Sequence, residues 1–180
     1  MVPPAAATVV IGDSVVRNIK LYAAATYCVP GARVLDLLER IPALPIKHAD
    51  AGKVVIHIGT HDIASQQSEV LKRDFNSLFN LLKNCRKSVF ISGPLPSFHR
   101  GVGRFSRLLS LTTWLQSACS LHNLVLIDNF NLFWERAAFF FNRDGIHPID
   151  FICRHLSAPK TSWQLFNRIP RVFIMPAFKS

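Results

Sequence analysis

The feature that most constrains the fold is a series of short apolar runs, rich in Val and Ile and separated by stretches with helical periodicity. Strands buried on both faces of a parallel sheet look like this in sequence, whereas strands with one wet face alternate apolar and polar residues. Strand and helix alternate about five times, which predicts an α/β fold with a doubly wound, mostly parallel five-stranded sheet flanked by helices. The expected strands are Thr8 to Gly12, Thr26 to Val29, Lys53 to Gly59, Ser88 to Ser92 and Leu124 to Asp128.

Two of the intervening segments carry a clear helical stripe. Leu71, Phe75, Leu78, Phe79 and Leu82 follow the spacing of one buried face of a helix. A second helix is expected from about Arg104 to Leu121. We expect its buried side to carry Phe105, Leu108, Leu109, Thr112, Leu115 and Cys119.

Composition narrows the class of protein. The chain has 180 residues, 49% of them hydrophobic and only 18% charged, which excludes intrinsic disorder and favours one packed domain. No run reaches the roughly 18 to 20 apolar residues of a membrane span. Residues 1–7 lack the basic start of a secretory signal, and no two of the four cysteines are close enough for a C-x-x-C pair. We therefore expect a cytoplasmic protein that is not secreted, without a metal site or disulfide framework. The cysteines are Cys28, Cys85, Cys119 and Cys153.

The net charge of +10 is unevenly distributed. Residues 1–70 contain six basic and six acidic side chains, so the whole excess lies in residues 71–180. Such an excess suits an RNA or anionic membrane partner, because basic side chains that neutralise phosphates release counterions. It equally suits a surface that is basic only for solubility.

Polar residues follow the carboxyl end of the first strand, where ligands bind in parallel sheets. Ser14, after Gly12 and Asp13, would stand at a strand-to-helix turn with its hydroxyl at the sheet edge and its N–H available to an oxyanion. The same residues also suit a simple helix N-cap, since Asp and Ser are both common there. Taken alone, this turn favours capping over catalysis.

Two further segments carry histidine. His57 and His61 would have metal-ligand spacing only on a helix, and the preceding Val-Val-Ile run predicts a strand, so a metal site is disfavoured. His57 then becomes a buried strand residue, and Asp62 is expected to cap the following helix or to hold the loop. Farther on, Asp144 and His147 flank a Gly that permits a tight turn, so the carboxylate can accept the imidazole Nδ1–H and leave Nε2 as a base. An ordinary Asp-Gly turn is the alternative.

Together these segments resemble the SGNH (GDSL-type) hydrolases, which have a flavodoxin-like sheet. The resemblance covers roughly residues 8–148. Within that superfamily it is to the esterase domain in the first open reading frame of vertebrate LINE-type retrotransposons. The matching segments are Gly12-Asp13-Ser14-Val15-Val16-Arg17, Pro30-Gly31-Ala32-Arg33-Val34, Gly59-Thr60-His61-Asp62-Ile63, Ser92-Gly93-Pro94-Leu95-Pro96 and Asp144-Gly145-Ile146-His147-Pro148.

The resemblance implies a role for each matching position. Ser14 would be the nucleophile, His147 the general base and Asp144 the carboxylate that orients it. The backbone N–H groups of Ser14 and Gly31 would form two oxyanion donors. The family's third donor is usually an Asn side chain, and here the position is His61, whose ring we expect to donate in its place. No cofactor is implied.

The implied function is a serine carboxylic-ester hydrolase acting on a lipid or short-acyl ester through an acyl-enzyme. One alternative is a ribonucleoprotein module with weak or no activity that binds RNA, a membrane or itself. Another is a carbohydrate O-acetylesterase, which shares the same active-site chemistry. We expect residues 1–148 to form the esterase domain and residues 149–180 to be an atypical basic, aromatic tail. The tail has five basic side chains after Asp150 with no acid, and three prolines, and suits a shifted reading frame or an RNA- or membrane-binding extension.

Overall fold

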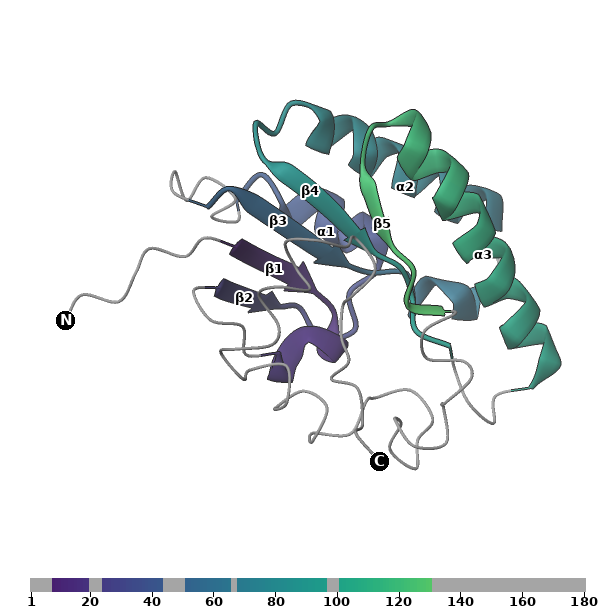
Figure 1. Cartoon of the computed structure of the whole chain (residues 1–180). Coiled ribbons are helices and arrows are strands. Elements are labelled where there is room, and N and C mark those ends of the chain that lie inside the picture. Colours follow the sequence, from purple (N-terminus) through teal and green to yellow (C-terminus); the bar gives the residue numbers. More distant parts are fainter. Residues whose placement is uncertain (1–7, 20–23, 44–50, 66–67, 97–100, 131–180) are drawn as a thin grey trace, which may run out of the picture.

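The computed structural model describes residues 8–19, 24–43, 51–65, 68–96 and 101–130 (Figure 1). The strands are β1 (Thr8–Gly12), β2 (Ala24–Cys28), β3 (Lys53–His57), β4 (Ser88–Ser92) and β5 (Val125–Ile127). The α-helices are α1 (Val34–Arg40), α2 (Ser68–Lys83) and α3 (Val102–Leu121). Two short 3-10 helices, η1 (Ser14–Asn18) and η3 (Asp62–Ser65), follow β1 and β3.

The strands form one five-stranded sheet in the order β2-β1-β3-β4-β5, and every pair is parallel. This confirms the predicted fold class. Three strands differ from their predicted limits. β2 begins and ends earlier than Thr26 to Val29, and β3 stops at His57 instead of Gly59. β5 is one residue shorter at each end than Leu124 to Asp128. Gly59 has a φ of +112°, a conformation outside the extended region, so the strand cannot continue through it.

Figure 1 shows α1, α2 and α3 together on one face of the sheet. The side chains that β1, β3 and β4 direct to that face join the helices in one core: Val9, Ile11, Val54, Ile56, Val89 and Ile91. The predicted stripe of α2 is confirmed, since all five of its members are buried. In α3 the prediction for Leu109 is wrong, because that side chain is 41% exposed and Leu111 is buried instead. Leu109 lies about 100° around the helix axis from Leu108 and so leaves the buried face.

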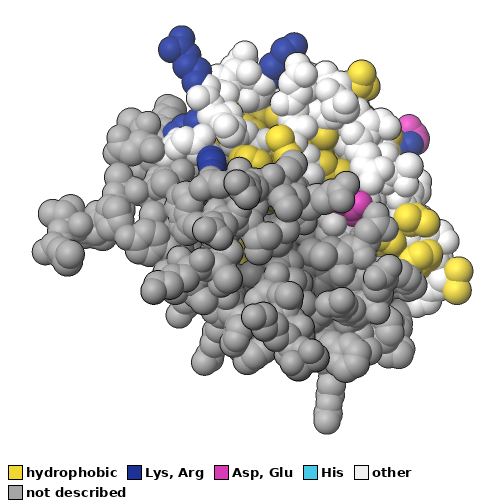
Figure 2. All heavy atoms as spheres, viewed as in Figure 1, with side chains coloured by type: hydrophobic (Ala, Val, Ile, Leu, Met, Phe, Trp, Pro, Cys, Tyr) yellow, Lys and Arg dark blue, Asp and Glu magenta, His cyan; other side chains and the backbone are white. Residues whose placement is uncertain are grey.

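None of the helices in the described ranges has the length and apolar character needed to cross a membrane. On the face drawn in Figure 2, Lys and Arg side chains of the described residues stand mainly along the upper left of the view, and exposed apolar side chains lie along the right. Six large apolar side chains of the described residues are exposed: Leu35, Val70, Leu81, Val102, Leu109 and Leu121.

Candidate active site

Three of the predicted site residues lie in loops that leave adjacent strands at one edge of the sheet. Gly12 pairs with Cys28 of β2 and with His57 of β3, so the three strands end level with one another. Ser14 follows β1, Gly31 follows β2 and His61 follows β3. Because all three strands are parallel, these loops emerge at the same carboxyl edge, where open α/β sheets bind their ligands.

Close packing explains the glycine before the Asp13-Ser14 turn. A Cβ on Gly12 would lie 2.5 Å from the backbone oxygen of His57 and 2.8 Å from Cγ1 of Val16. Only glycine therefore lets β1 approach β3 and η1 at this point. The chain then turns at Asp13, whose Oδ1 accepts a hydrogen bond from the Val15 N–H at 2.9 Å. The capping interpretation of this turn is correct for Asp13, and it leaves Ser14 as the first residue of η1.

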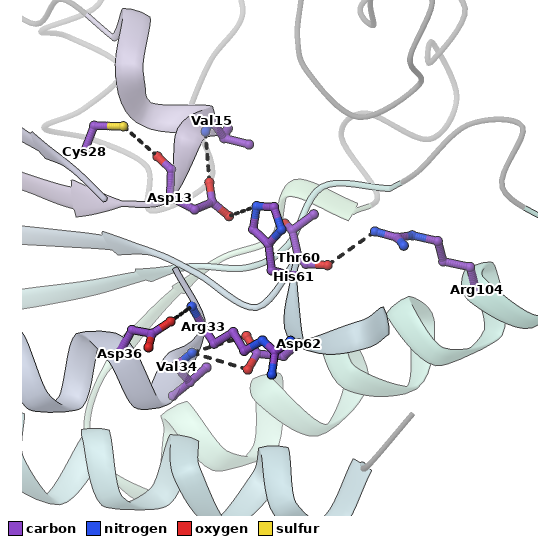
Figure 3. A network of polar contacts seen from close by, with 10 residues as sticks. All are labelled: Asp13, Val15, Cys28, Arg33, Val34, Asp36, Thr60, His61, Asp62 and Arg104. Carbon is purple, nitrogen blue, oxygen red and sulfur yellow. Dashed lines mark hydrogen bonds and ion pairs between the residues drawn. The ribbon is translucent and has the colours of Figure 1, made fainter. Parts of the chain in front are cut away.

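The other carboxylate oxygen of Asp13 faces His61. Asp13 is fully buried, and its Oδ2 has no hydrogen-bond partner. Nε2 of His61 lies 3.9 Å from that oxygen, and the His61 side chain is 37% exposed (Figure 3). A buried carboxylate oxygen costs free energy unless a donor or a positive charge lies near it. This cost favours the orientation in which the imidazole faces Asp13. The sequence prediction treated Asp13 only as a cap and missed this contact.

The Gly31 loop is held by hydrogen bonds at the start of α1. Gly31 has a φ of +72°, which favours glycine, and the Ala32 N–H donates to the Val29 carbonyl at 3.1 Å. At the start of α1, the Arg33 N–H donates to the carboxylate of Asp36 at 2.8 Å. The Val34 N–H donates to both carboxylate oxygens of Asp62, at 3.2 and 3.3 Å.

Asp62 was expected either to cap the helix that follows it or to hold the loop, and its carboxylate holds the loop. It caps α1, a helix that begins 28 residues earlier in the chain. Burial raises the pKa of Asp62 to about 6, against the lowering effects of the backbone hydrogen bonds and of Arg33. From the other side, Arg104 of α3 donates from Nη2 to the Thr60 carbonyl at 3.3 Å (Figure 3). The turn that carries His61 is therefore anchored to both α1 and α3.

A buried polar network lies behind the site, on β3, β4 and the residues after β5. Nδ1 of His57 lies 2.9 Å from the Ser92 hydroxyl, and Asn129 Nδ2 donates to the same hydroxyl at 2.7 Å and to the Gly93 carbonyl at 2.8 Å. Burial lowers the pKa of His57, while the nearby Asp13 opposes that shift. His57 is thus a buried strand histidine, as predicted. The roles of Ser92 and Asn129 were not predicted, although a polar residue at the end of each buried strand was the available signal.

The remaining predicted site residues, Asp144 and His147, lie outside the described residues, as does the predicted boundary between residues 148 and 149. Within the described ranges, no group of three His, Cys, Asp or Glu side chains is arranged to hold a metal ion. Of the cysteines, Cys28, Cys85 and Cys119 are free thiols.

This fold and edge-of-sheet serine define a class: the chain is an α/β protein of the GDSL (SGNH) hydrolase type. The solved structures that share the architecture include an acetylxylan esterase and a lipolytic protein. Axe2, an acetylxylan esterase from Geobacillus stearothermophilus, is 16% identical over 84% of this chain and 90% of that one, with a TM-score of 0.66. A lipolytic G-D-S-L family protein from Veillonella parvula is 15% identical over 92% of this chain and 98% of that one, with a TM-score of 0.69. At these identities the likeness establishes the fold.

Sequence identity gives the closer relationship. The esterase domain of the ORF1 protein from the zebrafish ZfL2-1 retrotransposon is 41% identical over 79% of this chain and 89% of that domain, with a TM-score of 0.43. The chain belongs to the GDSL (SGNH) esterase family that includes this retrotransposon domain. No protein-family model and no curated protein matches the chain.

Proposed function

We propose that the chain is a serine carboxylic-ester hydrolase that acts through an acyl-enzyme on Ser14. The observation that carries the proposal is the convergence of Ser14, Gly31 and His61 at the carboxyl ends of three adjacent parallel strands. Membership of an esterase family supports the same chemistry. A retrotransposon origin is part of the proposal, and the identity to the zebrafish domain supports it.

In the proposed mechanism, Ser14, the His147–Asp144 pair and the oxyanion donors have separate roles. The Ser14 hydroxyl oxygen attacks the ester carbonyl carbon while His147, oriented by Asp144, takes the hydroxyl proton. The carbonyl oxygen gains the negative charge and is stabilised by the N–H groups of Ser14 and Gly31 and by the His61 ring. The C–O bond to the alcohol then breaks, and His147 returns the proton to the leaving oxygen. Water attacks the acyl group by the same route and releases the acid and free Ser14.

His61 decides how well this oxyanion hole works. Its Nε2 faces Asp13, so the nitrogen left for the substrate is Nδ1, and that nitrogen donates only when it carries a proton. We therefore assign His61 as a third donor, which acts through the N–H of its Nδ1.

The proposed substrates are lipid or short-acyl esters. Acetylated carbohydrates are a second candidate, since Axe2, which shares the fold, is an acetylxylan esterase. A p-nitrophenyl ester series from acetyl to palmitoyl, together with an acetylated xylan, distinguishes the two groups. A preference for the longer acyl chains supports lipid esters, and release of acetate from the xylan supports the second candidate.

The test of the mechanism compares the wild-type chain with Ser14→Ala, and uses Ser110→Ala, an exposed serine on α3, as the matched control. We expect Ser14→Ala to lose about 10³-fold or more of kcat and Ser110→Ala to match the wild type. A fluorophosphonate probe should label Ser14, as mapped by peptide mass spectrometry. Turnover that is equal in the wild type and Ser14→Ala, without labelling of Ser14, would leave a binding module as the better assignment.

A further inference from the structure

Asp62 connects the two loops that carry the Gly31 and His61 oxyanion donors. It directly follows His61 in the turn after β3, and its carboxylate accepts the Val34 N–H from the loop after β2. Val34 is the first residue of α1 and stands three residues after Gly31. The local carboxylate of Asp36 accepts the Arg33 N–H, and the next N–H, that of Val34, is satisfied by the carboxylate from the neighbouring loop (Figure 3).

We propose that Asp62 is a positioning residue for the oxyanion hole, which fixes the Gly31 loop relative to the His61 turn through its bonds to the Val34 N–H. The proposal rests on the proposed esterase function. An oxyanion hole works only if its donors are fixed before charge develops on the substrate. A shift of about 1 Å between the two loops would separate the donors and cost on the order of 100-fold in rate.

The energetics of Asp62 separate this role from simple helix capping. Burial outweighs the two backbone hydrogen bonds, so the pKa of Asp62 is raised to about 6. The charged groups that face it are Arg33 from the β2–α1 loop, which lowers the pKa, and Asp74 from α2, which raises it. An acid with a raised pKa destabilises the folded state when it ionises. The ionised carboxylate therefore costs stability at neutral pH, and helix capping for stability alone does not explain its presence.

Removing the charge of Asp62 should therefore preserve or raise stability and at the same time lower activity. A purely structural role does not predict this combination. Asp62→Asn keeps the size of the side chain and one carbonyl acceptor but removes the charge. At pH 8 we expect Asp62→Asn to unfold at the same or a higher temperature than the wild type. Its kcat should nevertheless fall about 10-fold, because a charge-assisted hydrogen bond is roughly twice as strong as a neutral one. Asp62→Ala should lose more, about 100-fold, and KM should change little in both variants.

Asp36→Asn is the matched control. Asp36 is a second carboxylate at the start of the same helix, and it accepts the Arg33 N–H without contacting the His61 turn. We expect this variant to keep wild-type kcat. If Asp36→Asn lowers kcat as much as Asp62→Asn, or if activity and stability fall together in Asp62→Asn, the link between the two loops is not the reason for the loss and the proposal is wrong.

A pH profile adds an independent reading. On the acid side, the wild type should lose about 10-fold more kcat/KM than protonation of His147 alone causes, because Asp62 also takes up a proton there. Asp62→Asn should show only the slope of one that His147 gives. A profile of the same shape in both proteins overturns the proposal.

An NMR titration separates failure of this inference from failure of the esterase function. The Val34 amide resonance should move with a midpoint near pH 6 in the wild type and in Asp36→Asn, and should stay constant through this range in Asp62→Asn. This reading needs no turnover. An inactive wild type that still shows the Val34 titration refutes the esterase function and leaves the hydrogen bond intact, and an active wild type without the titration refutes the role of Asp62.

Discussion

Gly12→Ala tests the contact between β1 and β3 that places Ser14. The new methyl group would stand 2.5 Å from the His57 backbone oxygen and 2.8 Å from Cγ1 of Val16. Neither neighbour can rotate away cheaply, because the oxygen belongs to a central strand and Val16 is fully buried. Either β1 must move away from β3 or η1 must move outward.

The expected cost lies at the upper end of what overpacking a core causes, about 3 kcal/mol. For a chain of this length each kcal/mol lowers Tm by about 2 to 4 °C, so Tm should fall by about 6 to 12 °C. Activity should fall further than stability alone predicts, because Ser14 is only two residues away and a displacement of about 1 Å costs on the order of 100-fold.

Gly52→Ala is the matched control, since a Cβ at Gly52 meets no atom within 4 Å and the residue is exposed. Thermal unfolding followed by circular dichroism should place this variant within about 0.5 kcal/mol of the wild type. Ester hydrolysis, measured below both unfolding transitions, gives the second comparison. If Gly12→Ala has the same Tm and the same rate of ester hydrolysis as Gly52→Ala, the close approach of the strands does not hold Ser14 in place.

Three further predictions concern the core and the site. Phe75→Ala removes a fully buried ring that contacts Phe79 and Trp114, and should cost about 3 to 5 kcal/mol in a urea unfolding experiment; a loss below about 1 kcal/mol would contradict this packing. His61→Ala should lower kcat about 10²- to 10³-fold, whereas His61→Asn, which supplies an amide donor, should stay within about 10-fold of the wild type; equal losses would exclude donation by this side chain. The raised pKa of Asp62 means that its proton stabilises the fold, so the free energy of unfolding of the wild type should fall as pH rises from about 4 to about 6. Asp62→Asn should lack this pH-dependent component. An identical pH dependence of unfolding in both proteins would refute the raised pKa.

The strands and the buried helix faces were predictable because buried positions determine the spacing of apolar residues in the sequence. The stripe of α2 needed only helical periodicity, and the parallel direction of the strands followed from their alternation with helices. Strand ends were less predictable, since the end of β3 depends on the backbone conformation of Gly59. Leu109 was assigned to the wrong face because the long helix α3 has two apolar edges in sequence, and only packing against the sheet selects one of them.

The site was predictable in its residue types and only partly in its contacts. Motif spacing located Ser14, Gly31 and His61, because each directly follows a recognisable strand. The partners of the carboxylates were not predictable, since Asp62 caps a helix that lies earlier in the chain and Asp13 faces a residue 48 positions later. Spacing rules for helix caps consider only the next turn of the same helix. Contacts between loops of neighbouring strands depend on sheet order, which has to be known first.

The two carboxylates whose partners were not predicted, Asp13 and Asp62, lie at the same edge of the sheet. Asp13 is buried with an unpartnered oxygen, Asp62 keeps a carboxylate where burial disfavours its charge, and Gly31 has a left-handed backbone. The two carboxylates cost stability, whereas glycine adopts the left-handed backbone of Gly31 freely. Costly features persist where function requires them, so their position at the carboxyl edge of β1, β2 and β3 argues for chemistry at Ser14. The energetics of the chain therefore point to this edge of the sheet independently of the resemblance to known esterases.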